Sequence, residues 1–279
     1  MRNFISFGIT KNKKNIAYET LTGNLYDYFM LGRYFKDIYN LDKISNKKTP
    51  FKKNLIHDTK DLKFNLINFL LILKFKNKNF YEFGFTIYEK IFYFKFFKFF
   101  LQENINLKKI NFYGNEISEK FIFFCKNFYK GYNLRLFREV KRKYLNNSVF
   151  FSKGVTLLYE KKNIQYLRYF IKYCDVGSFD ISLYPEKKTI LLKTGYKLYY
   201  PSINDFVKIL NESNKCFFYR NKKKIRNKMY FEILFGNEKI ANEINKKLHI
   251  IFKNKKNSRI KKYLFLKQRF ERLKLSHFK

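Results

Sequence analysis

Basic and aromatic side chains are interleaved along this whole chain, and that pattern limits the folds it can adopt. Its 279 residues include 36 Phe and 23 Tyr, and 60 Lys and Arg stand against 22 Asp and Glu, a formal net charge of +38. In the segment 94–99, Lys95 and Lys98 lie directly beside phenylalanines. This aromatic content is sufficient for a real core, and disorder throughout the chain is not expected.

The positive charge is the second constraint. Like charges repel each other in the compact state, and no globular fold requires a charge this large. We therefore expect a polyanion around the protein. Residues with AT-rich codons fill the sequence, whereas alanine occurs only at Ala17 and Ala241. This bias is typical of an AT-rich organelle genome, and it predicts a location in the mitochondrion, in the matrix.

Several kinds of site are not predicted. Cys125, Cys174 and Cys216 are widely spaced and form neither a disulfide framework nor the paired spacing of a zinc site. The ten glycines are scattered, without a phosphate-cradling loop. We therefore predict no cofactor, no metal and no catalytic residue. The most apolar segments, 64–75 and 87–101, are respectively too short and too rich in lysine to span a bilayer.

Hydrophobic periodicity predicts the secondary structure. The expected helices are 26–39, 61–74, 88–102, 163–173, 203–210 and the helix-forming end 239–279. The expected strands are 80–87, 105–113, 179–183, 189–192, 195–200 and 216–219. The segment 229–234 is expected to be helical or a turn before Gly236.

A series of short motifs follows in the carboxy-terminal half. Its members are Lys193-Thr194-Gly195-Tyr196-Lys197-Leu198-Tyr199, an apolar strand at 216–218, the basic segment Tyr219-Arg220-Asn221-Lys222-Lys223, and Gly236-Asn237-Glu238. Their order resembles that of the small-subunit ribosomal protein number eight family, which has a Lys-Pro-Gly run, a Ser-Thr-Ser-Lys-Gly loop and a Gly-Gly-Glu element. Residues 61–112 resemble the amino-terminal domain of the same family.

The resemblance implies a fold and a function. The implied fold class is α+β, with two small α/β modules (helix–strand–helix–strands, then a β-rich module) and basic helical extensions. The implied function is that of a structural constituent of a mitochondrial small ribosomal subunit, which is not an enzyme and has no small-molecule substrate. Its partners would be the central domain of small-subunit ribosomal RNA and neighbouring ribosomal proteins.

The same resemblance divides the chain and implies its RNA-binding residues. The divisions are an extension at 1–60, a module at 61–112, an insertion at 113–178, an RNA-binding module at 179–240 and a basic helical tail at 241–279. The implied RNA-binding residues are Lys193, Lys197, Tyr199, Tyr219, Arg220, Asn221, Lys222, Lys223, Lys224, Gly236 and Asn237. Two alternatives stay open at this point: a different organellar ribosomal protein, or a basic accessory subunit of an inner-membrane respiratory or ATP-synthase complex.

Overall fold

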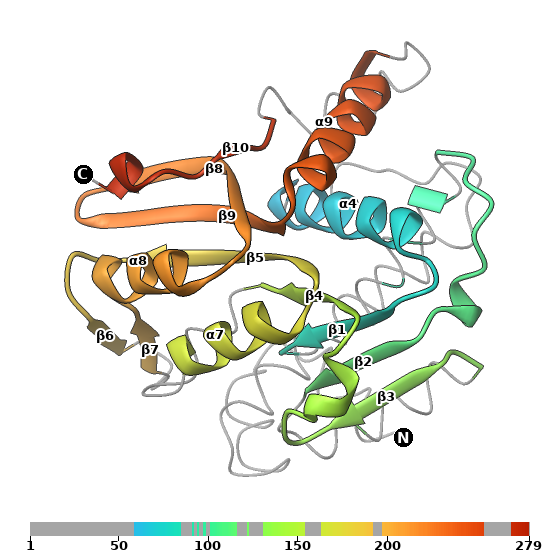
Figure 1. The fold of residues 1–279 in the computed structure, drawn as a ribbon, viewed down its shortest axis with the longest axis horizontal. Helices are drawn as coiled ribbons and strands as arrows, with labels where there is room; N and C mark the ends of the chain where they lie inside the picture. Colours follow the sequence, from blue (N-terminus) through green and yellow to red (C-terminus); the bar gives the residue numbers. More distant parts are fainter. Residues whose placement is uncertain are drawn as a thin grey trace, which may run out of the picture.

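The computed structural model describes residues 59–84, 91, 94, 97–98, 101–115, 122, 131–153, 163–191, 197–253 and 269–278. In this part of the chain, helices cover both faces of a large sheet (Figure 1). The expected helix 26–39 lies outside the described residues.

The elements are named as in Figure 1. The helices whose two ends lie within the described residues are α4 (Thr59–Lys74), α7 (Asn163–Tyr173), α8 (Ile203–Glu212) and α9 (Glu238–Lys253), with the single-turn helices η1 (Leu107–Lys109), η2 (Arg142–Tyr144) and η5 (Leu275–Phe278). The strands are β1 (Asn79–Phe83), β2 (Phe112–Asn115), β3 (Leu134–Phe137), β4 (Ser148–Ser152), β5 (Val176–Leu183), β6 (Lys188–Leu191), β7 (Lys197–Tyr200), β8 (Cys216–Ile225), β9 (Lys228–Gly236) and β10 (Glu271–Arg272).

The large sheet has eight strands in the order β10-β8-β9-β5-β4-β1-β2-β3. The five strands β5, β4, β1, β2 and β3 are parallel to one another. Strand β9 runs antiparallel to both β5 and β8, and β10 runs antiparallel to β8. Strands β6 and β7 form a separate antiparallel hairpin between β5 and α8.

This topology shows that the predicted α+β fold class is wrong. The two stretches expected to form separate modules meet in one sheet, since the first supplies β1 and the second supplies β8 and β9. Strands β3 and β4 come from 113–178, the stretch expected to be an insertion. The chain order reverses at β1, because β2 and β3 lie on one side of it and β4 and β5 on the other. The architecture is therefore a doubly wound α/β sheet with an antiparallel addition.

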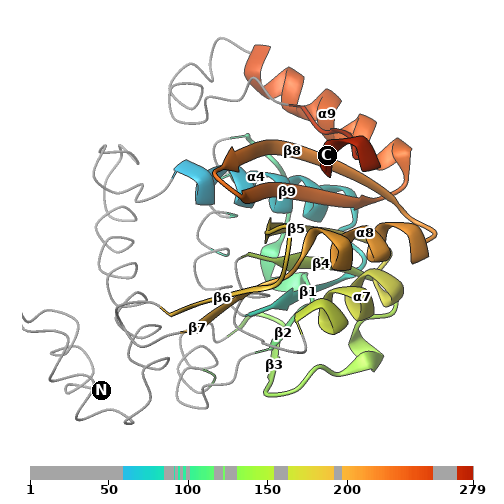
Figure 2. The ribbon, with the colours of Figure 1, turned by 90° about the vertical axis from the view of Figure 1, so that its left-hand side faces the viewer.

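Each face of the sheet has its own core cluster. Helices α4 and α9 pack on one face, together with the helical residues Ile91, Phe94 and Phe97. Helices α7 and α8 pack on the opposite face. Figure 2 shows these two layers from a view at right angles to that of Figure 1.

Strand β1 connects the two clusters because it is buried on both faces. Phe80 packs against Phe112 and Phe151, with ring centroids 6.1 and 5.8 Å apart. On the other face, Tyr81 and Phe83 lie 5.6 and 4.8 Å from the ring of Phe170 in α7. A parallel strand that is covered on both faces needs apolar side chains pointing to each face of the sheet, and β1 has them.

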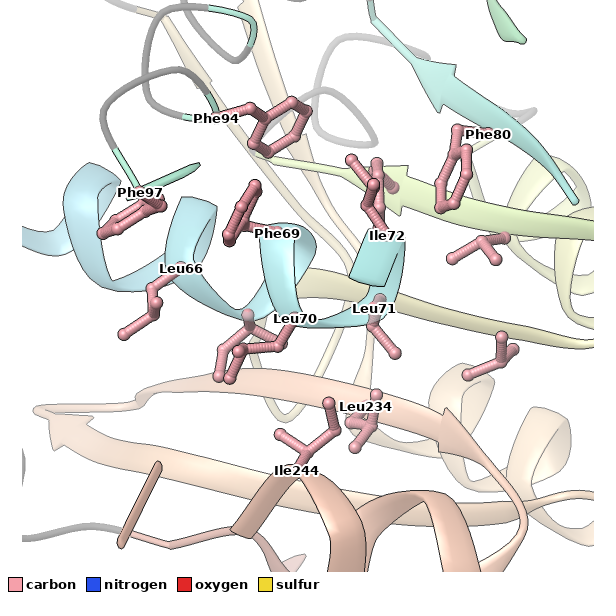
Figure 3. Packing of buried hydrophobic residues seen from close by; sticks show 14 of the residues in the cluster. Leu66, Phe69, Leu70, Leu71, Ile72, Phe80, Phe94, Phe97, Leu234 and Ile244 are labelled. Atoms are coloured by element: carbon pink, nitrogen blue, oxygen red, sulfur yellow. The ribbon is translucent and has the colours of Figure 1, made fainter. Parts of the chain in front are cut away.

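Helix α4 fills the space between the sheet and its neighbouring helices. The ring of Phe69 lies 6.0 Å from Phe94 and 5.8 Å from Phe97. Figure 3 shows Leu70 of α4 pointing toward Leu234 of β9 and Ile244 of α9. Helix α4 thus joins segments that are distant in sequence into one core.

The carboxy-terminal segment 269–278 crosses the edge of the sheet. Phe270 belongs to the cluster under α9, whereas Leu273 belongs to the cluster under α8. The backbone N–H of Leu273 donates to the carbonyl oxygen of Phe217 at 2.8 Å. Farther along, the ring of Phe278 lies 5.4 Å from that of Phe231. The segment therefore covers part of the β8 edge, which would otherwise expose backbone groups.

The expected strands 80–87, 179–183, 189–192, 195–200 and 216–219 are confirmed with shifted ends as β1, β5, β6, β7 and β8, whereas most of 105–113 lies outside β2. The helix expected at 163–173 is confirmed as α7, and those at 61–74 and 203–210 are confirmed with small shifts of their ends. Ser202 and Asp205 form a capping box that begins α8. The prediction for 229–234 is wrong, because these residues lie in β9. Helix α9 ends at Lys253, and residues 271–272 form β10 rather than a helix.

We predict that Gly177→Ala lowers the free energy of unfolding by about 1–3 kcal/mol through overpacking. A Cβ at Gly177 would lie 2.6 Å from the carbonyl oxygen of Phe150 and 2.7 Å from a ring carbon of Phe235. Because the closest neighbour is backbone, it cannot rotate away. Urea unfolding measures the change, and a shift within about 0.5 kcal/mol would contradict this packing.

Candidate ligand site at the carboxyl edge

The carboxyl ends of β1 and β4 lie side by side, with Phe83 opposite Ser152. The chain that follows β1 leads to the helical residues on the α4 face, whereas the chain that follows β4 leads to α7 on the opposite face. Connections that leave adjacent strands toward opposite faces open a crevice at the strand ends. Figure 2 views the molecule from this edge. A ligand site is therefore expected at this edge of the sheet.

Gly84 directly follows β1 at this crevice. It is buried, and its φ is +73°. This left-handed conformation is open to glycine at little cost, whereas a β-branched residue is strained there. Gly84 therefore adopts this conformation at the end of β1 without the strain that a β-branched residue would have.

Ser152 ends β4 beside this turn and is 1% exposed. Its Oγ has no hydrogen-bond partner among the residues that the structure describes. Leaving a buried hydroxyl unpaired costs about 1–3 kcal/mol, and such groups are uncommon in native proteins. A donor or acceptor on a bound ligand would remove that cost.

Asn115 ends β2 on the other side of β1, opposite Phe83. Its Oδ1 accepts a hydrogen bond of 2.5 Å from the Tyr81 hydroxyl, and both residues are buried. Burial raises the pKa of the Tyr81 phenol well above its usual 10.0, so that the hydroxyl remains a donor. The bond orients the Asn115 amide with its Nδ2 group directed away from Tyr81.

Ser152, Phe83 and Asn115 therefore form one register line across β4, β1 and β2. Glu82, a buried carboxylate, precedes Phe83 on the α4 face of the sheet. A turn without a side chain, an orphan hydroxyl and an oriented amide meet at the point where the strand order reverses. Together they are suited to holding a small polar molecule.

The structure divides the RNA-binding residues predicted from the sequence among separate places. Lys193 lies outside the described residues, and Lys197 and Tyr199 are in β7. Gly236 and Asn237 lie at the opposite, amino edge, where Asn237 Oδ1 accepts a hydrogen bond of 3.0 Å from the Ile240 N–H at the start of α9. None of these residues lies on the register line at the carboxyl edge.

The remaining predicted residues lie on β8. Lys222, Lys223 and Lys224 are exposed near the β8–β9 turn. The half-buried Tyr219 donates a hydrogen bond of 3.2 Å to Glu271 of β10. The structure thus places Tyr219 to Lys224 together on one strand of the large sheet, whereas Lys197 and Tyr199 belong to the separate β6–β7 hairpin.

Arg220 has a buried position. It is 2% exposed, and its Nε donates to Glu232 Oε2 at 2.7 Å. Asn221, at a positive φ of 57°, donates from Nδ2 to the other carboxylate oxygen of Glu232 at 2.9 Å. The guanidinium of Arg220 also lies 5.3 Å from the ring centroid of Phe270. Arg220 therefore joins β8, β9 and the carboxy-terminal segment.

We predict that Arg220→Met costs about 3–5 kcal/mol of stability, because it leaves the Glu232 carboxylate buried without its cation. The double replacement Arg220→Met with Glu232→Leu removes both charges and should recover most of that loss. Urea unfolding of both single variants and the double variant forms a cycle. Additive losses in this cycle would show that the two charges do not interact.

We also predict that Tyr230 makes the free energy of unfolding fall as the pH rises above 10. Burial, followed by the charges of Asp180 and Glu232, raises the pKa of its phenol far above the usual 10.0. Above that pH the unfolded chain loses the proton and the folded chain keeps it, so stability falls by up to about 1.4 kcal/mol per pH unit for this group. Tyr230→Phe should reduce the slope of unfolding free energy against pH. An unchanged slope in the Tyr230→Phe variant would contradict the raised pKa of the Tyr230 phenol.

The residues at the carboxyl edge were not predicted from the sequence. Gly84 lay inside the segment 80–87 that we expected to be a continuous strand. Its signal was a lone glycine between a buried strand and a helical pattern, which marks a tight turn. Ser152 and Asn115 carried no local signal, because only the pairing of distant strands brings them beside Gly84.

Comparisons with known proteins gave structural similarities only. No protein-family model matches the chain, and no curated protein matches it. The amino-terminal domain of EvdMO1, solved in the presence of SAH and D-fucose, has a TM-score of 0.47 and 8% identity over 74% of this chain and 97% of that chain. With TM-scores below 0.5, such similarities assign neither a family nor an activity to this chain.

Two methyltransferases show similar values. Magnesium protoporphyrin IX methyltransferase from Synechocystis PCC 6803 with bound SAH has a TM-score of 0.38 and 13% identity over 74% of this chain and 98% of that chain. A SAM-dependent methyltransferase from Leishmania major has a TM-score of 0.41 and 13% identity over 78% of this chain and 89% of that chain.

The ribosomal assignment is wrong, together with everything that depended on it. It required two separate modules, whereas the matched stretches are strands of one doubly wound sheet. The predicted roles in translation and RNA binding, the ribosomal partners, the absence of a small-molecule substrate and the absence of enzymatic activity are therefore corrected, and neither alternative assignment is supported. The mitochondrial location stays a prediction.

Two kinds of feature are absent from the described ranges. In those residues, no three His, Cys, Asp or Glu side chains gather in an arrangement that would hold a metal ion. In the same part of the chain, no helix combines the length and apolarity needed to cross a bilayer.

Proposed function

We propose that this protein is an enzyme that binds S-adenosylmethionine at the carboxyl edge between β1 and β4. The observation that carries the proposal is the reversal of strand order at β1, which places Gly84, Ser152 and Asn115 at one crevice. Doubly wound sheets bind nucleotide-type ligands at this position.

The sequence after β1 selects among such ligands. Dinucleotide sites have three glycines in the spacing Gly-x-Gly-x-x-Gly, so that bare backbone can approach a pyrophosphate. Here the first is Gly84, but Thr86 and Glu89 occupy the other two positions. A carboxylate repels a pyrophosphate, and the missing glycine removes its close approach to the backbone. The residues do not fit a dinucleotide, and they favour a nucleoside ligand without phosphate.

S-adenosylmethionine is a ligand of that chemistry. When bound, it supplies an activated methyl group to a nucleophile on an acceptor and leaves S-adenosylhomocysteine. Asn115 is the polar residue at the end of the strand next to β1, where doubly wound sheets bind a ribose hydroxyl. Ser152 would give its unpaired hydroxyl to the ligand, and Gly84 would leave room above β1. Each of these roles belongs to a buried residue of the register line or to the turn beside it.

We predict that the full-length protein binds S-adenosylhomocysteine in isothermal titration calorimetry and does not bind NAD. Gly84→Val should weaken binding by at least about tenfold, because a β-branched residue is strained at positive φ and fills the crevice. Ser152→Ala should weaken binding by a smaller factor, through the loss of one hydrogen bond.

The matched control is Lys78→Ala at the amino edge, where Lys78 pairs with Asp175. This variant should bind as the unchanged protein does. Circular dichroism establishes that each variant is folded. Absence of S-adenosylhomocysteine binding, or equal losses in Gly84→Val and Lys78→Ala, would contradict the proposed site.

A further inference from the structure

Two hairpins project from the carboxyl edge beyond the sheet. The β6–β7 hairpin begins at Pro185, just after β5, and returns at Pro201, whose carbonyl oxygen accepts a hydrogen bond of 3.2 Å from the Tyr184 N–H. The β8–β9 turn lies at the same edge, and both hairpins are visible there in Figures 1 and 2.

Aromatic and basic side chains pack at the base of the β6–β7 hairpin and connect it to the turn end of the β8–β9 hairpin. The rings of Tyr184 and Tyr200 pack edge to face, with centroids 5.1 Å apart. Lys188 Nζ lies 4.9 Å from the ring of Tyr184, and Lys228 Nζ lies 5.0 Å from the ring of Tyr200. Lys228 begins β9 directly after the β8–β9 turn, and Tyr200 ends β7, so the contact between Lys228 and Tyr200 joins the two hairpins.

Leu191 is the apolar residue at the outer end of this surface. It is 65% exposed, and it pairs with Lys197 at the end of the β6–β7 ladder farthest from the sheet. The other large apolar side chains with comparable exposure in the described residues are Ile250 of α9 and Leu275 of η5. Leu191 differs from them because it stands on a projecting hairpin whose base is lined with lysines.

Positive charge surrounds that apolar residue. The exposed basic residues of the two hairpins are Lys187, Lys188, Lys222, Lys223, Lys224 and Arg226. Two carboxylates offset part of this charge. They are the exposed Glu186, directly before Lys187, and Asp205, which lies 3.6 Å from Lys187. The described residues of the two hairpins therefore present a net cationic surface, with the exposed Leu191 in the last described pair of the β6–β7 ladder.

We propose that this surface docks on a membrane that contains anionic lipids, with Leu191 inserted at the headgroup boundary. Lysines and arginines are attracted to the negative headgroups, and an exposed leucine gains by leaving water for the acyl region. A soluble polyanion would satisfy the basic residues but would offer no apolar environment to Leu191. The exposed leucine is what favours a lipid surface over a soluble partner.

The experiment uses the absence of tryptophan from the whole chain. Leu191→Trp places a single indole at the end of β6 in the β6–β7 hairpin. Ile250→Trp places one on α9 as the matched control. Each full-length variant is mixed with vesicles of equal parts phosphatidylcholine and phosphatidylglycerol, and separately with phosphatidylcholine vesicles and with heparin. The emission of the indole reports whether it leaves water.

We expect a blue shift for Leu191→Trp with the anionic vesicles alone, and none for Ile250→Trp. In co-sedimentation, Leu191→Glu should lower partition onto the anionic vesicles by at least about tenfold, and Ile250→Glu should change it much less. Binding with the indole at 191 still in water, equal effects at the two positions, or no binding to anionic vesicles would each overturn the proposal. An equal blue shift with heparin would also overturn it.

Discussion

The burial of β1 on both faces is the constraint on which the rest of the structure depends. Phe80 faces the cluster under α4, and Tyr81 and Phe83 face the cluster under α7. A strand with two apolar faces needs a layer of helices on each side, and parallel neighbours reached through crossovers supply those layers. The order in which the parallel strands are added reverses at β1, and the proposed ligand site lies at the carboxyl end of the strands where that order reverses. The ligand site is therefore a consequence of how the core is built.

The antiparallel part of the sheet extends this framework and gives it a second kind of surface. Strand β9 pairs with β5 along most of its length, and the buried pair of Arg220 and Glu232 holds β8 to β9. Because β9 runs opposite to β5, the β8–β9 turn emerges at the same edge as the carboxyl ends of the parallel strands. The proposed ligand crevice and the cationic hairpins thus face the same side of the molecule. A protein docked through these hairpins would turn the proposed ligand site toward the lipid surface.

Local sequence patterns predicted most of the helices and several of the strands, but not which strands are neighbours in the sheet. Helix α7 was predicted with its observed ends because its apolar residues repeat at helical spacing. Residues 229–234 were misread because β9 is an almost continuous buried run, and its periodicity does not separate a strand from a helix. Parallel pairing joins residues that are far apart in sequence, such as Phe83 with Ser152, and no local pattern records it. The motifs that resembled a ribosomal protein kept their order along the chain, but order alone does not specify which strands are neighbours.

The proposed function requires a ligand site where the carboxyl ends of β1 and β4 meet. Hydrogen–deuterium exchange of the full-length protein with and without S-adenosylhomocysteine tests this most directly. We expect S-adenosylhomocysteine to slow exchange in peptides that contain residues 80–84 and 149–153. We expect no change at the β8–β9 turn or at the amino edge. Protection confined to the β8–β9 region, with the ends of β1 and β4 unaffected by the ligand, would contradict it.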